Sequence, residues 1–358
     1  MGNSINNLLD NLISLTWRLM DLPLYALLLM IVVCLVGVNW LGRRWLWKLS
    51  EQKRLYINGA LVLLMLLFVI DKKFSFVRAE MTFLNEKIRT AQMSSYSVQG
   101  GIPFELDSLQ QVFPDAELTQ RPINEAIQLV SIKQKNPNSV AYVARVDLSN
   151  PLVDVQITPR KKEKYLTSVF AKENNCILAI NGEAGETMAM DCELGEWSGN
   201  WVSDGKVVMM VDTDKRPFIG FSKENDANYY EESFVDRKYK DAYYNAIWGR
   251  FDILKKGKLV KHNPDKPYAR TVMGLSEDGK YLYLMIVDGK RPDHSVGLTY
   301  ADCATILGSL GAYDAMACDQ GGSSCMYVKN MGGIINRPAD SDGVERPIYS
   351  HFGIAMKK

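Results

Sequence analysis

Two aspartates in the C-terminal half of the chain each follow an apolar run and open a glycine-bearing loop. The run YLYLMIV leads to Asp288-Gly289, and the run YDAMAC leads to Asp319, the first residue of the loop DQGGSS (319–324). Two carboxylates at one site can act as general acid and base, as a nucleophile, or as stabilisers of a cationic transition state. The glycines allow close backbone approach, and successive N–H groups with the two serine hydroxyls can bind an anion.

The alternative is that both aspartates only form turns, because Asp-Gly is a common turn dipeptide. Two carboxylates at matched strand ends, the second leading into two glycines and two serines, favour a site over two unrelated turns. The loop lacks the lysine and the spacing of a P-loop, so nucleotide binding is not expected.

The segment between the two aspartates predicts how they are positioned. A helix is expected over 299–310, with Thr299 as its N-cap and Gly311 just past its end. Strand–helix–strand in this length is most simply a right-handed βαβ crossover with parallel strands. The carboxyl ends of parallel strands lie on one edge of a sheet, so Asp288 and Asp319 should emerge on the same rim.

From about residue 127 onward, short β-rich runs alternate with turn signals, and helices are few. The runs that predict strands are VAYVARVDL, CILAIN, KVVMMVD, RPFIGFS, YNAIWGRFDIL, RTVMGLS, KYLYLMIVDG, YDAMACD and HFGIAM. A second helix is expected over 161–173. This pattern predicts an α+β domain built around a large mixed β-sheet, with few helices and one βαβ unit.

The N-terminal part has a different composition. Residues 1–90 carry 11 Lys and Arg against 6 Asp and Glu, whereas the remaining residues carry 31 against 35. The net charge of +1 argues against a nucleic-acid binder, which would show a strong basic excess. The 47% share of hydrophobic residues excludes a disordered chain.

Two apolar runs predict an α-helical transmembrane hairpin. Residues 22–41 contain no charge and are long enough to cross about 30 Å of hydrocarbon, and residues 55–70 form a shorter run. The alternative is a pair of buried core helices. Five Lys or Arg residues lie between positions 43 and 54, so the positive-inside rule places this loop in the cytoplasm and both termini outside.

The expected organisation is therefore a membrane anchor over 1–73, an amphipathic helix and linker over 74–126, and a catalytic domain over 127–358. Apolar residues from Phe74 to Ile88 recur at spacings of three and four, over only about two heptads. One amphipathic helix explains this pattern. The sharper alternative is a homodimer formed through residues 74–91.

Five short motifs occur in a fixed order along the C-terminal part of the chain. They are AING (179–182), GNWVSD (199–204), ART (269–271), VDG (287–289) and DQGGSS (319–324). Each is weak alone, but together they resemble the phosphodiester glycosidase family. The resemblance covers roughly residues 140–358, and Asn336-Arg337-Pro338 and Arg346 match the family's polar C-terminal region.

The resemblance implies hydrolysis of a sugar-1-phosphodiester, which releases the sugar and leaves the phosphate on its other alcohol. In this interpretation Asp288 and Asp319 are the catalytic carboxylates, and Arg270 neutralises phosphate charge. The candidate substrate-binding residues are Asn181, Gly182, Gly289, Gly321, Gly322, Ser323, Ser324 and Arg346.

Two positions depart from the family's usual pattern. Gln320 replaces a glycine, and Glu183-Ala184-Gly185 replace a glycine and paired aromatic residues. Glu183 is either a substitute catalytic acid or a solvated loop residue, and we favour the second interpretation.

No metal site or cofactor is expected. The three histidines, His262, His294 and His351, are scattered and lack the spacing of a zinc site. Among the six cysteines, Cys176 and Cys192 are a candidate disulfide pair.

The expected function is that of a membrane-anchored glycosidase with its catalytic domain outside the cytoplasm, on the periplasmic or extracellular face. Its substrate would be a GlcNAc-1-phosphodiester-like linkage in a glycan or envelope polymer; the membrane is a further partner and nucleic acid is not. The alternatives are a phosphodiesterase that cleaves the P–O bond and a catalytically silent glycan-binding domain, which the departures at Gln320 and Glu183 make credible.

Overall fold

In a computed structural model of the chain, two units are distinguished. The first comprises Met1–Leu84 with Ser341–Gly343, and the second comprises Asn85–Asp340 with Val344–Lys358. The structure describes residues 101–159, 164–183, 199–211, 216–231, 243–340 and 344–357, and isolated helical positions between 52 and 70.

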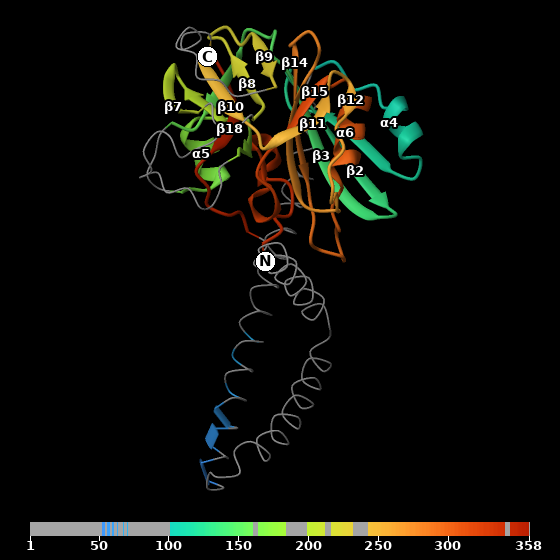
Figure 1. Cartoon of the computed structure of the whole chain (residues 1–358), viewed down its shortest axis with the longest axis vertical. Coiled ribbons are helices and arrows are strands. Elements are labelled where there is room, and N and C mark those ends of the chain that lie inside the picture. Colours follow the sequence, from blue (N-terminus) through green and yellow to red (C-terminus); the bar gives the residue numbers. More distant parts are fainter. Residues whose placement is uncertain are drawn as a thin grey trace. The chain divides into compact units, whose positions relative to one another are not determined.

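The second unit is dominated by strands, with few helices, as the sequence predicts (Figure 1). Its helices are α4 (Asp107–Val112), α5 (Thr167–Glu173) and α6 (Tyr300–Ser309), with short 3-10 turns η2 (Gly321–Ser323) and η3 (Lys329–Met331). The first nine strands are β1 (Glu117–Pro122), β2 (Ile127–Lys135), β3 (Asn138–Asp147), β4 (Val153–Ile157), β5 (Leu178–Asn181), β6 (Gly199–Ser203), β7 (Lys206–Val211), β8 (Phe218–Phe221) and β9 (Ala227–Tyr230). They are followed by β10 (Asn245–Trp248), β11 (Phe251–Lys255), β12 (Lys258–Leu259), β13 (Arg270–Leu275), β14 (Tyr281–Val287), β15 (Asp314–Ala317), β16 (Met326–Val328), β17 (Gly333–Ile334) and β18 (His351–Met356).

The described strands form three sheets instead of the one large sheet expected. The first has eight strands in the order β1-β2-β3-β14-β13-β15-β11-β12. The other two have five strands each, in the orders β7-β6-β10-β8-β9 and β17-β16-β5-β18-β4. In Figure 1 the eight-stranded sheet lies on the right with α4 and α6 beside it, and the five-stranded sheets lie on the left.

The eight-stranded sheet is buried on both faces. Successive side chains of a strand point to opposite sides of the sheet, so β14 contributes to the core on each side. In β14, Leu282, Leu284 and Ile286 join the core shared with the five-stranded sheets. Tyr283, Met285 and Val287 of the same strand join a second core, which includes Ile306 and Leu307 of α6. The sheet is therefore the middle layer between helices α4 and α6 on one face and the smaller sheets on the other, whereas α5 packs on β5, β16 and β18 of a five-stranded sheet.

The strand–helix–strand unit around α6 is present, with one strand inserted. β14 and β15 each pair with β13 in antiparallel register, so they run in the same direction with β13 between them. Thr299 caps α6 and exchanges hydrogen bonds with Asp302 in a capping box, and Gly311 follows the helix with a φ of 105°.

One predicted strand is in fact two. The run YNAIWGRFDIL divides at Gly249-Arg250 into β10 and β11, which belong to different sheets. A Cβ on Gly249 would lie 2.7 Å from Met316 Cγ and 2.8 Å from the Ala317 carbonyl oxygen. Glycine is therefore required where the chain crosses between sheets, and Arg250 follows at that crossing.

Several predicted features lie in the part of the chain before β2. β1 falls in the predicted linker, where one or two short elements are expected, and it pairs with β2 along its whole length. The predicted span 22–41 and the amphipathic segment 74–91 lie outside the described residues, and only single helical positions of the span 55–70 lie within them. Among the residues that the structure describes, no helix is both long enough and apolar enough to cross a membrane.

We predict that Leu284→Ala will destabilise the full-length chain by about 2–5 kcal/mol, because it removes buried methyl groups from the middle layer. Leu259, which is 41% exposed at the edge strand β12, offers a matched control, and Leu259→Ala should change stability by no more than about 0.5 kcal/mol. Urea unfolding measures both. Equal losses would contradict the assignment of β14 to the core.

Candidate active site

Three strands of the eight-stranded sheet meet at one edge. β13 begins at Arg270, opposite the last residue of β14, and β15 ends beside the same part of β13. Asp288 follows β14 and Asp319 follows β15 by two residues, so both emerge at this edge. The register confirms the prediction that the two aspartates share a rim.

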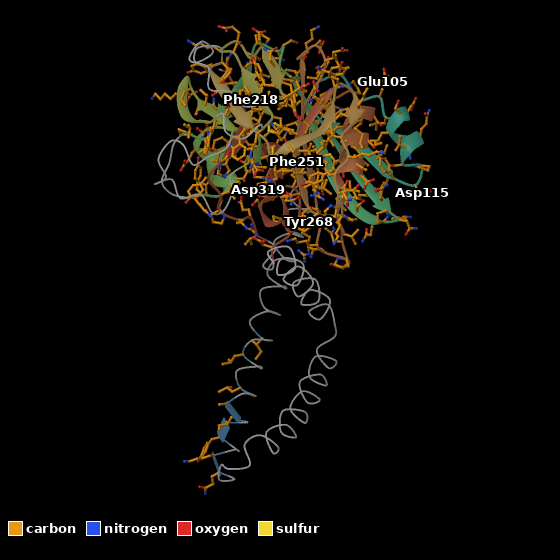
Figure 2. The ribbon with its side chains drawn as sticks, viewed as in Figure 1. Glu105, Asp115, Phe218, Phe251, Tyr268 and Asp319 are labelled. Carbon is orange, nitrogen blue, oxygen red and sulfur yellow. The ribbon has the colours of Figure 1, made fainter. Side chains whose placement is uncertain are left out.

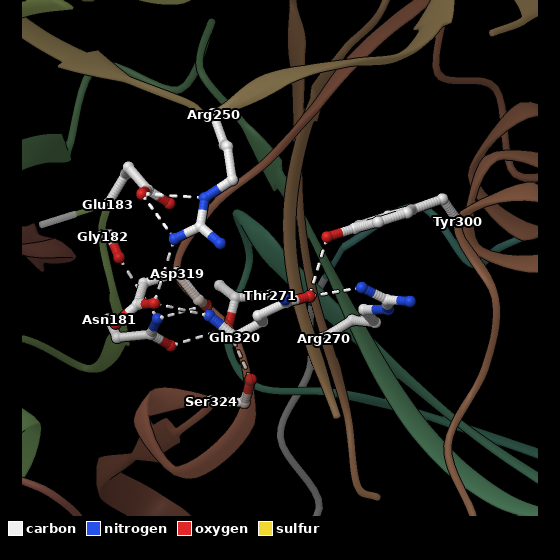
Figure 3. A network of polar contacts seen from close by, with 10 residues as sticks. All are labelled: Asn181, Gly182, Glu183, Arg250, Arg270, Thr271, Tyr300, Asp319, Gln320 and Ser324. Atoms are coloured by element: carbon white, nitrogen blue, oxygen red, sulfur yellow. Dashed lines mark hydrogen bonds and ion pairs between the residues drawn. The ribbon is translucent and has the colours of Figure 1, made fainter. Parts of the chain in front are cut away.

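Arg250 joins Asp319 to a second carboxylate, that of Glu183 (Figure 3). The terminal nitrogen Nη2 of Arg250 lies 2.8 Å from Glu183 Oε1 and 3.3 Å from Asp319 Oδ1. Arg250 Nε also donates to Glu183 Oε1, at 3.1 Å. A single guanidinium therefore contacts two carboxylates that come from the segments after β5 and β15.

Both carboxylates are buried, and each keeps one oxygen without a hydrogen bond. Glu183 is 2% exposed and Asp319 is 8% exposed. Glu183 Oε2, Asp319 Oδ2 and the hydroxyl of Ser323 are buried and have no partner within the described part of the chain. A buried polar atom without a partner costs about 1–3 kcal/mol, so the two carboxylate oxygens beside Arg250 mark a place where a ligand can supply the missing contacts.

The electrostatic environment of Glu183 favours a role in proton transfer. Burial raises the pKa of Glu183 to about 7, and the nearby Asp319 adds to the rise, although Arg250 opposes it. Burial disfavours the charge of Arg250, but the carboxylates of Glu183 and Asp319 raise its pKa above the usual value. Glu183 can therefore hold and release a proton near neutral pH beside a permanently charged guanidinium.

The expectation that Glu183 is a solvated loop residue is wrong. Its segment is held in place by Asn181, whose amide Nδ2 donates to the Asp319 carbonyl oxygen at 3.0 Å. Asn181 Oδ1 accepts from Thr271 Oγ1 at 2.8 Å and from the Cys325 N–H at 3.1 Å. The side chain of Asn181, predicted to bind substrate, thus fastens β5 to the loop that carries Asp319.

Three of the predicted glycines are required by close packing. A Cβ on Gly182 would clash with Ser350 Oγ, and one on Gly289 would clash with the backbone of Ala269. A Cβ on Gly322 would overlap the carboxylate of Asp340, which forms an ion pair with Arg346 (2.6 Å from Oδ1 to Nη2). Gly182 and Gly289 let segments of the rim approach each other, and Gly322 accommodates the Asp340–Arg346 pair.

Arg270 is buried and is bound to groups of the protein. It donates to the carbonyl oxygens of Lys266 (2.6 Å) and Leu298 (3.2 Å) and to Gln320 Oε1. Its guanidinium also lies 3.6 Å from the ring centroid of Tyr300, whose hydroxyl donates to the same Gln320 oxygen at 2.7 Å. Arg270 and Tyr300 thus hold the side chain of Gln320, next to Asp319 (Figure 3).

Asp288 occupies a separate network at the same rim. Its Oδ1 accepts from Asn336 Nδ2 (3.0 Å) and from the Arg337 N–H (2.9 Å), and its Oδ2 lies 2.7 Å from His294 Nε2. Asp288 is 1% exposed. These contacts tie the C-terminal segment 336–337 to β14, whereas the carboxylate that faces Asp319 is that of Glu183.

The serines of the 319–324 loop differ from each other. Ser324 Oγ lies 3.1 Å from Thr271 Oγ1, within hydrogen-bond distance, and its carbonyl oxygen accepts from Asn336 Nδ2. The hydroxyl of Ser323 is buried and has no hydrogen-bond partner among the described residues. Of the two, Ser323 is the one with a hydroxyl available to a ligand.

Comparison with known proteins identifies the family. The sequence profile described as phosphodiester glycosidase matches residues 174–355, which is more than half of the chain and includes every residue of the Glu183–Arg250–Asp319 cluster.

The chain belongs to the phosphodiester glycosidase family.

Two solved structures share the fold. The catalytic domain of zebrafish N-acetylglucosamine-1-phosphodiester alpha-N-acetylglucosaminidase, auto-inhibited by its pro-peptide, matches with a TM-score of 0.51 and 21% identity, over 66% of this chain and 83% of that one. A hypothetical protein from Synechocystis matches with a TM-score of 0.53 and 9% identity, over 68% of this chain and 64% of that one. No curated protein matches the sequence.

Within this phosphodiester glycosidase fold, sequence reasoning missed Arg250 and underrated Glu183. The signal for Arg250 was one arginine after a glycine inside an otherwise apolar run, which was interpreted as one continuous strand. For Glu183 the signal was its place two residues after β5, directly beyond Asn181-Gly182. Cys176 is a buried free thiol, and Cys192, its candidate disulfide partner, lies outside the described residues.

We predict that Glu183 makes the stability of the chain depend on pH. Its pKa is raised from 4.5 to about 7 in the folded state, so the fold binds a proton there that the unfolded chain releases. The stabilisation is present below about pH 4.5 and is lost as the pH rises through about 7. Between pH 5 and 8, Glu183→Gln should gain up to about 3 kcal/mol relative to wild type in unfolding free energy.

Urea unfolding at several pH values measures this difference. The exposed Glu224 provides the control, because Glu224→Gln should follow the wild-type curve. Parallel curves for wild type and Glu183→Gln would show that Glu183 does not titrate in this range.

Proposed function

We propose that this phosphodiester glycosidase hydrolyses a sugar-1-phosphodiester at the cluster of Glu183, Arg250 and Asp319. One observation carries the proposal: two buried carboxylates share a guanidinium, and each presents an oxygen that has no hydrogen bond among the described residues. Membership of the family supports the class of reaction. The sugar is proposed to be GlcNAc-like by analogy with the zebrafish enzyme of similar fold, and the alcohol on the phosphate is proposed to belong to a glycan or envelope polymer.

The reaction breaks the bond between the anomeric carbon and the phosphate oxygen. The bonding electrons leave with the phosphate monoester, and a water oxygen bonds to the anomeric carbon. The transition state requires stabilisation of the positive charge at the sugar and of the negative charge on the departing phosphate.

The two carboxylates are suited to different roles. Glu183, protonated near neutral pH, can donate a proton to an oxygen of the departing phosphate. Asp319 receives N–H donors from Arg250 and Gln320 at Oδ1, which leaves Oδ2 to face the developing cation and to accept the proton of the attacking water. Arg250 remains charged throughout and keeps the two groups adjacent.

We further propose that residues 1–73 anchor the chain in a membrane and place the catalytic domain outside the cytoplasm. The support is the uncharged run 22–41, the apolar run 55–70 and the basic loop between them. A dimer contact through residues 74–91 belongs to the same proposal and is tested by the mass of the detergent-solubilised chain.

We predict that Glu183→Gln and Asp319→Asn will each lower kcat for release of free sugar by about 10²–10⁴-fold, since each removes a proton donor or acceptor without changing shape. The substrates are a GlcNAc-1-phosphodiester and UDP-GlcNAc, and the products are separated by chromatography. The exposed Asp115, labelled in Figure 2, provides the control, and Asp115→Asn should keep wild-type activity.

The products separate this proposal from its alternatives. Sugar phosphate instead of free sugar would indicate cleavage of the P–O bond. Binding of several phosphodiesters by wild type without any turnover would indicate a silent glycan-binding domain.

The pH dependence of kcat/KM supplies a further prediction. If Glu183 donates a proton, kcat/KM falls as the pH rises through about 7, because the protonated form disappears. The residual activity of Glu183→Gln should lack this decline. A wild-type profile that is flat from pH 6 to pH 9 would exclude Glu183 as the acid.

A further inference from the structure

The ion pair of the proposed active site joins the two five-stranded sheets. Glu183 follows β5, in the sheet with the order β17-β16-β5-β18-β4, and Arg250 lies just after β10, in the sheet with the order β7-β6-β10-β8-β9. The labels β18 and β10 mark these two sheets in Figure 1. No described strand belongs to both sheets. The distance between Glu183 and Arg250 therefore depends on contacts from one sheet to the other.

The strand β4 is the last strand of its sheet, so one of its edges has no neighbouring strand there. Alternate carbonyl groups of a strand point to the same edge. Those of β4, and the carbonyl of Thr158 directly after it, accept hydrogen bonds from side chains of the other sheet. The four donors, which we call the β4 clamp, are Asn225 Nδ2 to Val153 (2.7 Å), Asn245 Nδ2 to Val155 (3.1 Å), Ser203 Oγ to Ile157 (2.7 Å) and Trp201 Nε1 to Thr158 (2.8 Å).

The β4 clamp is buried and comes in part from the GNWVSD motif (199–204). Each of its four side chains is at most 5% exposed, so loss of one donor leaves a buried carbonyl oxygen without its partner. Trp201 and Ser203 belong to the motif, and the Asp204 N–H donates to Asn245 Oδ1 at 3.0 Å. The motif therefore serves to fasten one sheet to the other.

One end of the β4 clamp is connected to the site through Thr158. The Oγ1 of Thr158 accepts from the His351 N–H at 2.9 Å, and the Thr158 N–H donates to the His351 carbonyl oxygen at 3.2 Å. His351 is paired with Asn181, which fastens β5 to the loop of Asp319 and lies two residues before Glu183. Trp201 thus acts on the strand that leads to Glu183.

The same end of the β4 clamp is connected to Arg250. The residue after Trp201, Val202, is paired with Ala246 of β10. From Ala246 the strand runs to Trp248, and Arg250 follows after one glycine. The hydrogen bond from Trp201 to Thr158 therefore connects the strand that leads to Arg250 with the strand that leads to Glu183.

The other end of the β4 clamp is remote from this connection. Asn225 binds Val153, which is paired with Met356, whereas Ile157 is paired with Phe352 beside His351. Val153 and Ile157 are separated by about 13 Å along the strand. Asn225 therefore fastens the same two sheets without contacting the segments that carry the site.

We propose that Trp201 and Ser203 are positioning residues, which hold Glu183 and Arg250 at the distance that catalysis requires. This inference rests on the proposed function, because it concerns the same ion pair. Neither residue needs to touch the substrate. Their hydrogen bonds to Thr158 and Ile157 fix one sheet against the other, and a misplacement of about 1 Å in reacting groups can lower a rate about 100-fold.

Two variants separate positioning from a purely structural role. Trp201→Phe keeps an aromatic ring and removes the indole N–H at the end near the site. Asn225→Gly is the matched control: it removes one buried donor at the remote end, and glycine accepts the φ of 71° at this position. Each variant loses one buried hydrogen bond to the same edge, so both should lower the urea midpoint of the full-length chain.

The readouts are kcat and KM for release of free sugar from a GlcNAc-1-phosphodiester, and the ¹³C chemical shift of the Glu183 carboxyl carbon. Trp201→Phe should lower kcat about 10–100-fold, leave KM unchanged and move the Glu183 signal. Asn225→Gly should keep all three at wild-type values. Ser203→Ala, a smaller change at the near end, should act like Trp201→Phe and replaces it if that variant folds poorly.

The positioning role is wrong if Trp201→Phe and Ser203→Ala keep the wild-type kcat and the wild-type Glu183 signal. It is also wrong if Asn225→Gly lowers kcat as much as they do. The proposed function fails in a different way. In that case wild type releases no free sugar, while the Glu183 signal still moves in Trp201→Phe and not in Asn225→Gly.

Discussion

The interaction on which the site depends is the contact of one guanidinium with two buried carboxylates. Without Arg250, Glu183 and Asp319 would place two like charges side by side in a buried region, and each would disfavour the charge of the other. Arg250 opposes this effect: burial and the neighbouring Asp319 raise the pKa of Glu183 to about 7, and Arg250 limits the rise, so Glu183 can hold a proton near neutral pH. A carboxyl group that titrates near neutral pH is suited to general acid catalysis.

The fold brings these three residues together from distant parts of the chain. Glu183 follows β5 of a five-stranded sheet, Asp319 follows β15 of the eight-stranded sheet, and Arg250 lies where the chain crosses between sheets. Asn181 connects the first two through the Asp319 carbonyl oxygen. The packing of the sheets against a common core fixes these positions, because a shift of one sheet would separate the carboxylates.

The local patterns predicted much of this domain. Hydrophobic alternation located the strands, Thr299 and Gly311 located α6, and the direction of β14 and β15 placed Asp288 and Asp319 on one rim. The pairing of Asp319 with Glu183 could not be predicted, because it depends on how separate sheets pack and not on the spacing of residues within one element. The division between β10 and β11 at Arg250 was missed for the same reason, since both halves have the apolar pattern of a strand.

The most direct test is the titration of the Glu183 carboxyl carbon by NMR in the full-length chain, in wild type and in Arg250→Gln. The predicted result is a pKa of about 7 in wild type, and a still higher pKa in the variant because the opposing positive charge is gone. A wild-type pKa near 4.5, or the same value with and without Arg250, would contradict the coupling of Glu183 and Asp319 through this arginine.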